Sequence, residues 1–102
     1  LWGNPVYDWD AHRRTGFAWW VARMRAMTRL FDLVRVDHFR GLEGYWAVPG
    51  GDATAVGGHW APGPGAELLA ALRAGLGSLP VVAEDLGVIT PEVEAIRDRF
   101  GF

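Results

Sequence analysis

Two acidic residues, each placed directly after a short apolar run, are the residues of this sequence best suited to chemistry. Asp37 ends the run "LVRV" and Glu84 ends the run "PVVA". Runs of this kind are typical of buried strands in parallel α/β sheets, where the carboxyl ends of the strands form the edge that carries active sites. If the two strands are neighbours, their ends lie about 5 Å apart. The two carboxyl groups would then flank a single bond.

Such a pair suits retaining glycoside chemistry, in which one carboxylate attacks the anomeric carbon and a second carboxyl group protonates the leaving oxygen. In enzymes of that type the two groups stand about 5–5.5 Å apart. Arg35 lies two positions before Asp37, so both point to the same side of a strand, and the guanidinium would keep Asp37 ionised as a nucleophile. Glu84 would have to begin protonated, which a drier position or the charge of Asp85 would favour.

Two other interpretations stay open on spacing alone. Arg35 and Asp37 would equally make a structural ion pair at a strand end, with Glu84 as the N-terminal charge of a helix. An oxygen-rich metal site is a further alternative, because His38 and Asp85 adjoin the two acids. Nothing in the spacing singles out the metal site.

The elements that would position these residues alternate between helices and short apolar strands. We expect a cleft loop at 1–14, a helix at 15–31, a strand at 32–37, a long loop at 38–64, a helix at 66–76, a strand at 80–84 and a helix at 90–100. Alternation of this kind predicts a parallel α/β sheet. Two strand–helix units cannot close such a sheet or cover both of its faces.

Capping signals and apolar spacing support the three helices. Thr15 can cap the first helix, whose buried face would consist of Trp20, Met24, Met27 and Phe31. Leucines recur at helical spacing in the second helix. Thr90, followed by proline, caps the third helix, and Gly101 ends it.

Composition excludes several classes of protein. The chain has 102 residues, of which 22% are charged and 50% hydrophobic, and its net charge of −2 indicates a globular protein that does not bind nucleic acid. Cysteine is absent, which rules out disulfides and thiolate metal sites. No apolar run is long enough to cross a membrane and no signal peptide is visible, so we expect a cytoplasmic location and no membrane partner.

Six tryptophans form a high proportion of this chain. Planar rings suit the faces of sugars, although tryptophan is also ordinary core material. The helical pattern around Trp19 and Trp20 favours packing. Either role is open for the tryptophans that lie near glycine and proline, which are Trp2, Trp9, Trp46 and Trp60. For Trp46, and for Tyr45 beside it, we favour packing within the loop.

Three stretches resemble the amylomaltases, the 4-α-glucanotransferases of glycoside hydrolase family 77 in the α-amylase superfamily. They are "WGNPVYDW" at 2–9, "LVRVDHFRGLEGYWAVP" at 33–49 and "VVAEDLGVITPEVEAIRDRFG" at 81–101. The intervening "AVGGHWAPGPGAEL" is also similar to a loop of the family, so the resemblance covers essentially the whole chain in order. It implies an α/β fold that is part of a (β/α)8 TIM barrel, with about two βα units around barrel strands 4 and 5. Residues 1–102 would be a fragment of a single catalytic barrel domain.

The resemblance also implies roles for individual residues. Asp37 matches the catalytic nucleophile and Glu84 the general acid/base. Arg35 matches the arginine that supports the nucleophile. Trp2 and His38 match substrate-binding positions, with hydrogen bonding inside the turn as an equal alternative for His38.

The activity implied by the resemblance is a retaining transfer of α-1,4-glucan segments between maltooligosaccharides, or between glucans derived from starch or glycogen. It proceeds through a covalent glycosyl-enzyme and needs no cofactor, and the donor and acceptor glucans are the only partners. The third acid of the family, an aspartate near the seventh barrel strand, has no counterpart here. We therefore expect the 102 residues alone to be inactive and not independently stable. An α-amylase-like hydrolase and a non-catalytic carbohydrate-binding chain are the alternatives.

Overall fold

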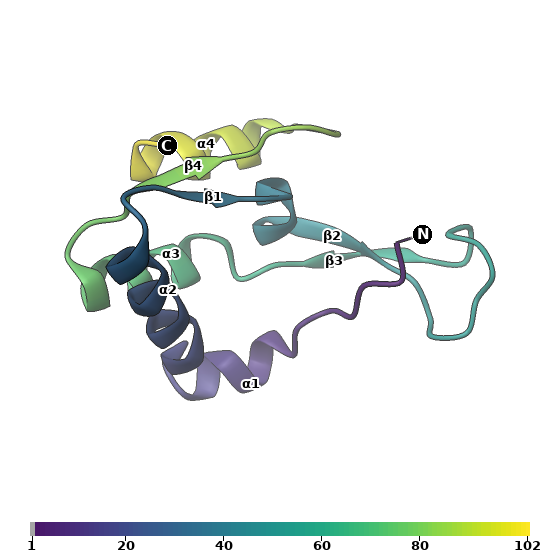
Figure 1. Ribbon diagram of the computed structural model, residues 1–102. Coiled ribbons are helices and arrows are strands. Elements are labelled where there is room, and N and C mark those ends of the chain that lie inside the picture. The colour runs from purple at the N-terminus through teal and green to yellow at the C-terminus, as the bar shows by residue number, and fades with distance from the viewer. Residues whose placement is uncertain (1) are drawn as a thin grey trace.

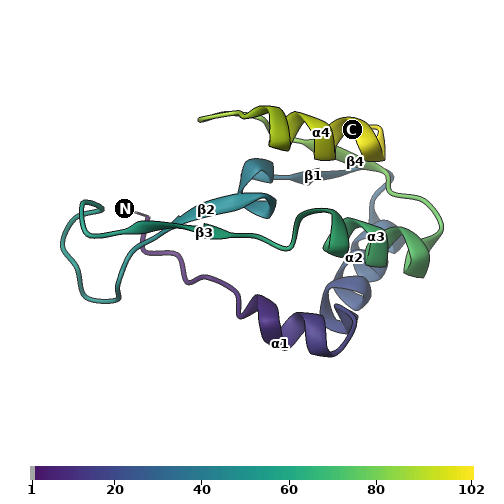
Figure 2. The ribbon, with the colours of Figure 1, turned by 180° about the vertical axis from the view of Figure 1, so that it is seen from behind.

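The computed structural model describes residues 2–102 as a mixed α/β unit (Figure 1). Within that range the elements are α1 (Trp9–Arg14), α2 (Ala18–Leu30), β1 (Val34–Val36), the 3₁₀ turn η1 (Phe39–Leu42), β2 (Gly44–Ala47), β3 (His59–Pro62), α3 (Gly65–Leu76), β4 (Val81–Ala83) and α4 (Pro91–Phe100). The helix α4 runs alongside β4, and the hairpin of β2 and β3 extends away from α2 and α3 in both views (Figures 1 and 2). None of the helices in the described range is long and apolar enough to cross a lipid bilayer.

The strands β1 and β4 pair in parallel, as the sequence predicted. In their register Val36 stands opposite Ala83. The pairing continues beyond the strands, because the backbone N–H of Glu84 donates to the carbonyl of Val36 at 3.0 Å. Asp37 and Glu84 therefore leave the sheet at the same edge.

Helices cover one face of this strand pair and leave the other open. The buried core consists of Phe17, Met24, Val34, Phe39, Leu68, Leu69, Leu72, Val93 and Phe100. On β1 the burial alternates, since Val34 is buried while Arg35 is exposed, and on β4 Val82 is exposed. The open face agrees with the expectation that two strand–helix units cannot cover both faces of the sheet, because the helices pack against one side only.

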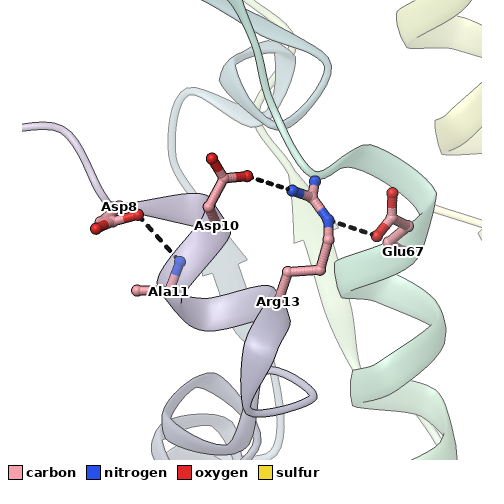
Figure 3. A network of polar contacts seen from close by, with 5 residues as sticks. All are labelled: Asp8, Asp10, Ala11, Arg13 and Glu67. Carbon is pink, nitrogen blue, oxygen red and sulfur yellow. Dashed lines mark hydrogen bonds and ion pairs between the residues drawn. The ribbon is translucent and has the colours of Figure 1, made fainter.

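The segment 1–14 is not a loop throughout, because α1 occupies its second half. Asp8 caps α1, with its side chain accepting the N–H of Ala11 at 3.0 Å (Figure 3). Thr15 ends this helix instead of starting the next one, and its hydroxyl donates to the carbonyl of His12 at 3.1 Å. The chain then turns through Gly16 and Phe17, both with positive φ, so α2 begins later than predicted.

The predicted buried face of α2 is right in three of its four positions. Met24 is buried, and Trp20 and Met27 are half-buried against the core. Phe31 is exposed because the helix ends at Leu30 and the backbone becomes extended. Trp20 also stacks on Trp9, with 5.7 Å between ring centroids and 29° between ring planes, so packing accounts for both rings.

A bridge of charges joins α1 to α3. Arg13 donates to Asp10 on its own helix at 2.9 Å and to Glu67 on α3 at 2.7 Å (Figure 3). The hydrogen bond that Arg13 donates to Glu67 raises the pKa of Arg13 above its ordinary value. This bridge holds the N-terminal helix against the element that supplies most of the core leucines.

The predicted long loop at 38–64 contains η1 and an antiparallel hairpin. In the hairpin, β2 pairs with β3 so that Trp46 stands opposite Trp60. The two strands are joined by residues 48–58, a connection longer than the two to five residues of common hairpins. That length concealed the pairing, because no short turn signal links the two apolar segments.

The last two helices agree closely with the sequence prediction. The leucines of α3 at 68, 69 and 72 are buried, and Gly77 follows the helix with a φ of 82°. Thr90 caps α4 by accepting the N–H of Val93, and Gly101 follows it with a φ of 73°. Leucine spacing and the glycine after the helix locate α3, and caps at both ends locate α4.

A substitution at Gly63 can test how closely β3 approaches the turn after β1. A Cβ at this position would meet the carbonyl of Leu42 and lie 2.7 Å from the carbonyl oxygen of Gly41, whereas at Gly50 it would meet nothing within 4 Å. Gly63→Ala should therefore lower the free energy of unfolding by about 1–3 kcal/mol, and the control Gly50→Ala should leave it almost unchanged. Denaturant unfolding of a full-length protein that carries this chain measures both, and equal effects would contradict the close contact.

Candidate active site

Asp37 is held by an arginine on its own strand. Arg35 Nη1 lies 2.7 Å from Asp37 Oδ1, which confirms that the two side chains point to the same side of β1. Both are open to solvent, with 60% of the Arg35 side chain and 76% of the Asp37 side chain exposed. The pair orients and neutralises the carboxylate, and exposed pairs of this kind contribute at most about 1 kcal/mol to stability.

The turn after Asp37 brings the backbone toward the second acid. His38 adopts a left-handed conformation with a φ of 50°, which is unfavourable for a residue with a side chain. Its N–H donates to Glu84 Oε2 at 2.7 Å. The imidazole lies against Gly41, where an added Cβ would come 2.5 Å from His38 Cδ2. Glycine at 41 therefore leaves room for the histidine ring.

Glu84 links the ends of β1 and β4 through its carboxyl group. Oε2 accepts the N–H of His38, and Oε1 accepts the N–H of Leu86 at 2.5 Å. The side chain is half-buried, while Asp85 is exposed. The predicted surroundings were a drier position or the charge of Asp85. In the structure, two backbone N–H groups face the Glu84 carboxyl group instead. Each oxygen accepts one N–H group and keeps a second lone pair, so Glu84 can carry and donate a proton without losing either contact.

The metal alternative lacks a cluster of ligands. Within residues 2–102, no three side chains of histidine, aspartate or glutamate gather closely enough to hold a metal ion. Asp37 is engaged with Arg35 and Glu84 with backbone N–H groups, so neither carboxylate is arranged as part of a ligand set.

Arg40 is a buried residue of this region for which no role was predicted. Its side chain donates to the carbonyl of Val88 at 2.8 Å and to the carbonyl of Gly44. Its guanidinium carbon lies 4.7 Å from the centre of the Trp60 ring. The sequence feature that could have indicated a buried Arg40 was the segment Phe39–Leu42, in which this arginine lies among apolar residues and glycine.

The tryptophans divide between packing and exposure. Trp46 donates through Nε1 to the carbonyl of Ala55 at 2.7 Å and meets Trp60 edge-on at 5.5 Å, which confirms packing for Trp46. Trp2 lies in the segment before α1 and is 93% exposed. The structure thus brings Arg35, Asp37, His38 and Glu84 together and leaves Trp2 outside that group.

The arrangement is suited to double displacement at an acetal carbon. An ionised carboxylate held by an arginine can attack the carbon, and a second carboxyl group on the neighbouring strand can exchange a proton with the oxygen that leaves or enters. Strand pairing and the His38 turn supply the positions of both groups.

Comparison with known proteins connects this geometry to a family. The family described as 4-alpha-glucanotransferase, glycoside hydrolase family 77, matches residues 1–102. A 4-alpha-glucanotransferase of Synechocystis sp. is 61% identical over 103 residues, which cover 100% of this chain and 20% of that protein. A 4-alpha-glucanotransferase of Solanum tuberosum, named chloroplastic/amyloplastic, is 50% identical over 97 residues, covering 95% of this chain and 17% of that protein.

A solved structure has the same fold over this region. The amylomaltase of Streptococcus agalactiae in complex with acarbose matches with a TM-score of 0.95 and 43% identity, covering 100% of this chain and 21% of that one. The chain therefore spans about a fifth of the length of the relatives it matches.

A substitution at Arg35 tests whether its ion pair with Asp37 contributes to the free energy of unfolding or only orients the carboxylate. Arg35→Gln removes the ion pair, and because both side chains are exposed we expect the free energy of unfolding to change by less than about 1 kcal/mol. Urea unfolding of a full-length protein that carries this chain measures the change. A loss of about 3 kcal/mol or more would contradict the exposed pair and indicate a buried one.

Proposed function

The chain belongs to the 4-alpha-glucanotransferase family, glycoside hydrolase family 77, and from this membership we propose that the whole protein transfers α-1,4-glucan segments between maltooligosaccharides or glucans derived from starch or glycogen. The observation that supports this most strongly is the parallel pairing of β1 and β4, which sends Asp37 and Glu84 from the sheet at one edge. Acarbose, an oligosaccharide analogue, is bound to the S. agalactiae amylomaltase and supports glucans as the substrate class.

We propose further that residues 1–102 form part of a single catalytic (β/α)8 barrel, with β1 and β4 as barrel strands 4 and 5. The one-sided helix cover supports this, because barrel strands carry helices outside and side chains inside. Leu33 and Val82 lie on the uncovered face and would point into the barrel, whereas the Arg35 guanidinium reaches Asp37 at the open carboxyl end of the strand. A barrel needs about 250 residues, so the rest of the whole protein supplies the other strands.

In the first half of the proposed reaction, Asp37 attacks the anomeric carbon of the donor glucan. Glu84 gives its proton to the glycosidic oxygen, and the bond between that oxygen and the anomeric carbon breaks. The sugar at the reducing side leaves, and the remaining glucan is joined to Asp37 as an ester. Arg35 donates a hydrogen bond to the Asp37 carboxylate and fixes its direction.

In the second half, the acceptor glucan enters the place that the first sugar left. Glu84, now a carboxylate, takes the proton from the 4-hydroxyl of the acceptor while this oxygen attacks the anomeric carbon and Asp37 departs. Two inversions give net retention of configuration. The two half-reactions use the carboxyl groups of this chain and no cofactor.

Substrate contact is proposed for two further residues. His38 is exposed beside Asp37, where its ring nitrogens can hydrogen-bond a sugar hydroxyl. Trp2 is exposed and offers a flat ring for stacking on a sugar face. A cytoplasmic location stays a prediction, and the potato relative carries a plastid location in its name.

The direct test uses a full-length host, which we define as the Synechocystis relative with its matching segment replaced by residues 1–102. The host is incubated with maltotriose and the products are separated by size. Free glucose with a ladder of longer maltooligosaccharides, and little rise in reducing ends, is the expected result. Shorter sugars alone, with reducing ends rising steadily, would contradict transfer and indicate an α-amylase-like hydrolase.

Substituting the two acids should abolish activity for different reasons. Asp37→Asn removes the nucleophile, so we expect kcat/KM for maltotriose to fall by several orders of magnitude. Glu84→Gln removes the acid and base and should be nearly as severe. Initial rates in the full-length host measure both losses, with Asp52→Asn in the hairpin connection as a matched control that should keep its activity. Full activity of Asp37→Asn would favour a non-catalytic carbohydrate-binding role for this chain.

Trp2→Ala tests whether this ring favours an acceptor sugar over water. Loss of a stacking surface should lower acceptor binding, so the ratio of transfer to hydrolysis should fall. Product analysis with maltotriose gives the ratio in the host with and without the substitution. An unchanged ratio would rule out this role for Trp2.

A further inference from the structure

Arg40 holds the segment that carries Glu84, and we infer that it is a positioning residue for the general acid/base. This inference rests on the proposed function of Glu84. It concerns a residue that touches neither acid and is 6% exposed. Burying a guanidinium is unfavourable unless its donors are satisfied. The hydrogen bonds of Arg40 therefore show which segments its burial holds together.

The hydrogen bonds of Arg40 join two segments that are far apart in the sequence. Nε donates to the carbonyl of Val88 at 2.8 Å, beyond β4, and Nη1 donates to the carbonyl of Gly44 at the start of β2. Glu43 lies 3.6 Å from Nη2. The guanidinium therefore fixes the position of Val88 relative to the turn that follows Asp37.

The segment from Glu84 to Val88 has little packing of its own. Leu86 is 74% exposed and Val88 is 66% exposed in the described chain, and Gly87 has a φ of 92°. Two polar anchors hold it instead. The N–H of His38 holds the carboxylate of Glu84 at one end, and Arg40 holds the carbonyl of Val88 at the other.

Both anchors come from the same turn, because His38 and Arg40 are two residues apart. The turn that places Asp37 therefore also sets the position of Glu84. Loss of the Arg40 anchor would leave the segment tied at one end, and Glu84 would lose its alignment with the glycosidic oxygen. A displacement of about 1 Å at a catalytic group can cost roughly 100-fold in rate.

The β2–β3 hairpin keeps the guanidinium in place. Trp60 on β3 lies against its face at 4.7 Å, and Gly44 on β2 accepts one of its N–H groups. The planar fork of arginine serves these contacts at once, whereas lysine has a single rotatable ammonium group. Arg40→Lys should therefore keep the charge and lose the alignment.

The test compares two donors in the full-length host. Maltotriose needs a proton on its leaving oxygen, whereas α-maltosyl fluoride releases fluoride with little acid assistance. Arg40→Gln should lower kcat/KM by roughly 100-fold for maltotriose and by only a few-fold for the fluoride. Glu84→Gln serves as the reference for loss of the acid. Arg40→Lys keeps the charge and should also lower kcat/KM more for maltotriose than for the fluoride.

Arg73 supplies a matched structural control. It donates to the carbonyl of Phe100 at 2.9 Å, and its guanidinium carbon lies 4.7 Å from that ring, so it makes contacts of the same kind as Arg40, although Arg73 is exposed and Arg40 is buried. Arg73→Gln should lower the melting temperature and affect both donors equally.

An equal loss on both donors in Arg40→Gln and Arg40→Lys would overturn the positioning role and leave a structural one. A different result would overturn the proposed function. If the unsubstituted host uses neither donor while the complete Synechocystis relative uses both, the proposed function fails, and the role of Arg40 fails with it.

Discussion

Parallel hydrogen bonding between β1 and β4 is the constraint on which the candidate site depends. Each strand has only three residues, yet the pairing brings together two acids that a hairpin and a helix separate in the sequence. Parallel strands require a crossover connection, and α3 within it buries three leucines on one side of the strand pair. The core thus holds the sheet together on one face and leaves the other for Arg35 and Asp37.

Backbone donors complete what strand pairing begins. The left-handed His38 directs its N–H at Glu84, and Arg40 fixes the chain beyond it. Each oxygen of Glu84 accepts one N–H group and keeps a second lone pair, so the carboxyl group can carry its proton within these contacts. The proposed chemistry therefore depends on the conformation of residues 84–88, which sets the position of this group.

Features set by local signals could be predicted from the sequence. Helices α3 and α4 followed from leucine spacing, from Thr90 and from Gly101, and the Arg35–Asp37 pair followed from strand alternation. The hairpin could not be found in this way, because its strands are joined by an unusually long connection. Arg40 was missed for a similar reason, since its partners Val88 and Trp60 are distant in the sequence and only the folded chain brings them to the guanidinium.

Trapping the glycosyl-enzyme tests most directly whether Asp37 is the nucleophile. In the full-length host with Glu84→Gln, α-maltosyl fluoride can still glycosylate the enzyme, but no base activates the acceptor, so the intermediate should accumulate. Proteolysis and mass spectrometry then locate the sugar. One maltosyl group on the peptide that contains Asp37 is the predicted result. A maltosyl group on another residue, or consumption of the fluoride with no adduct, would contradict it.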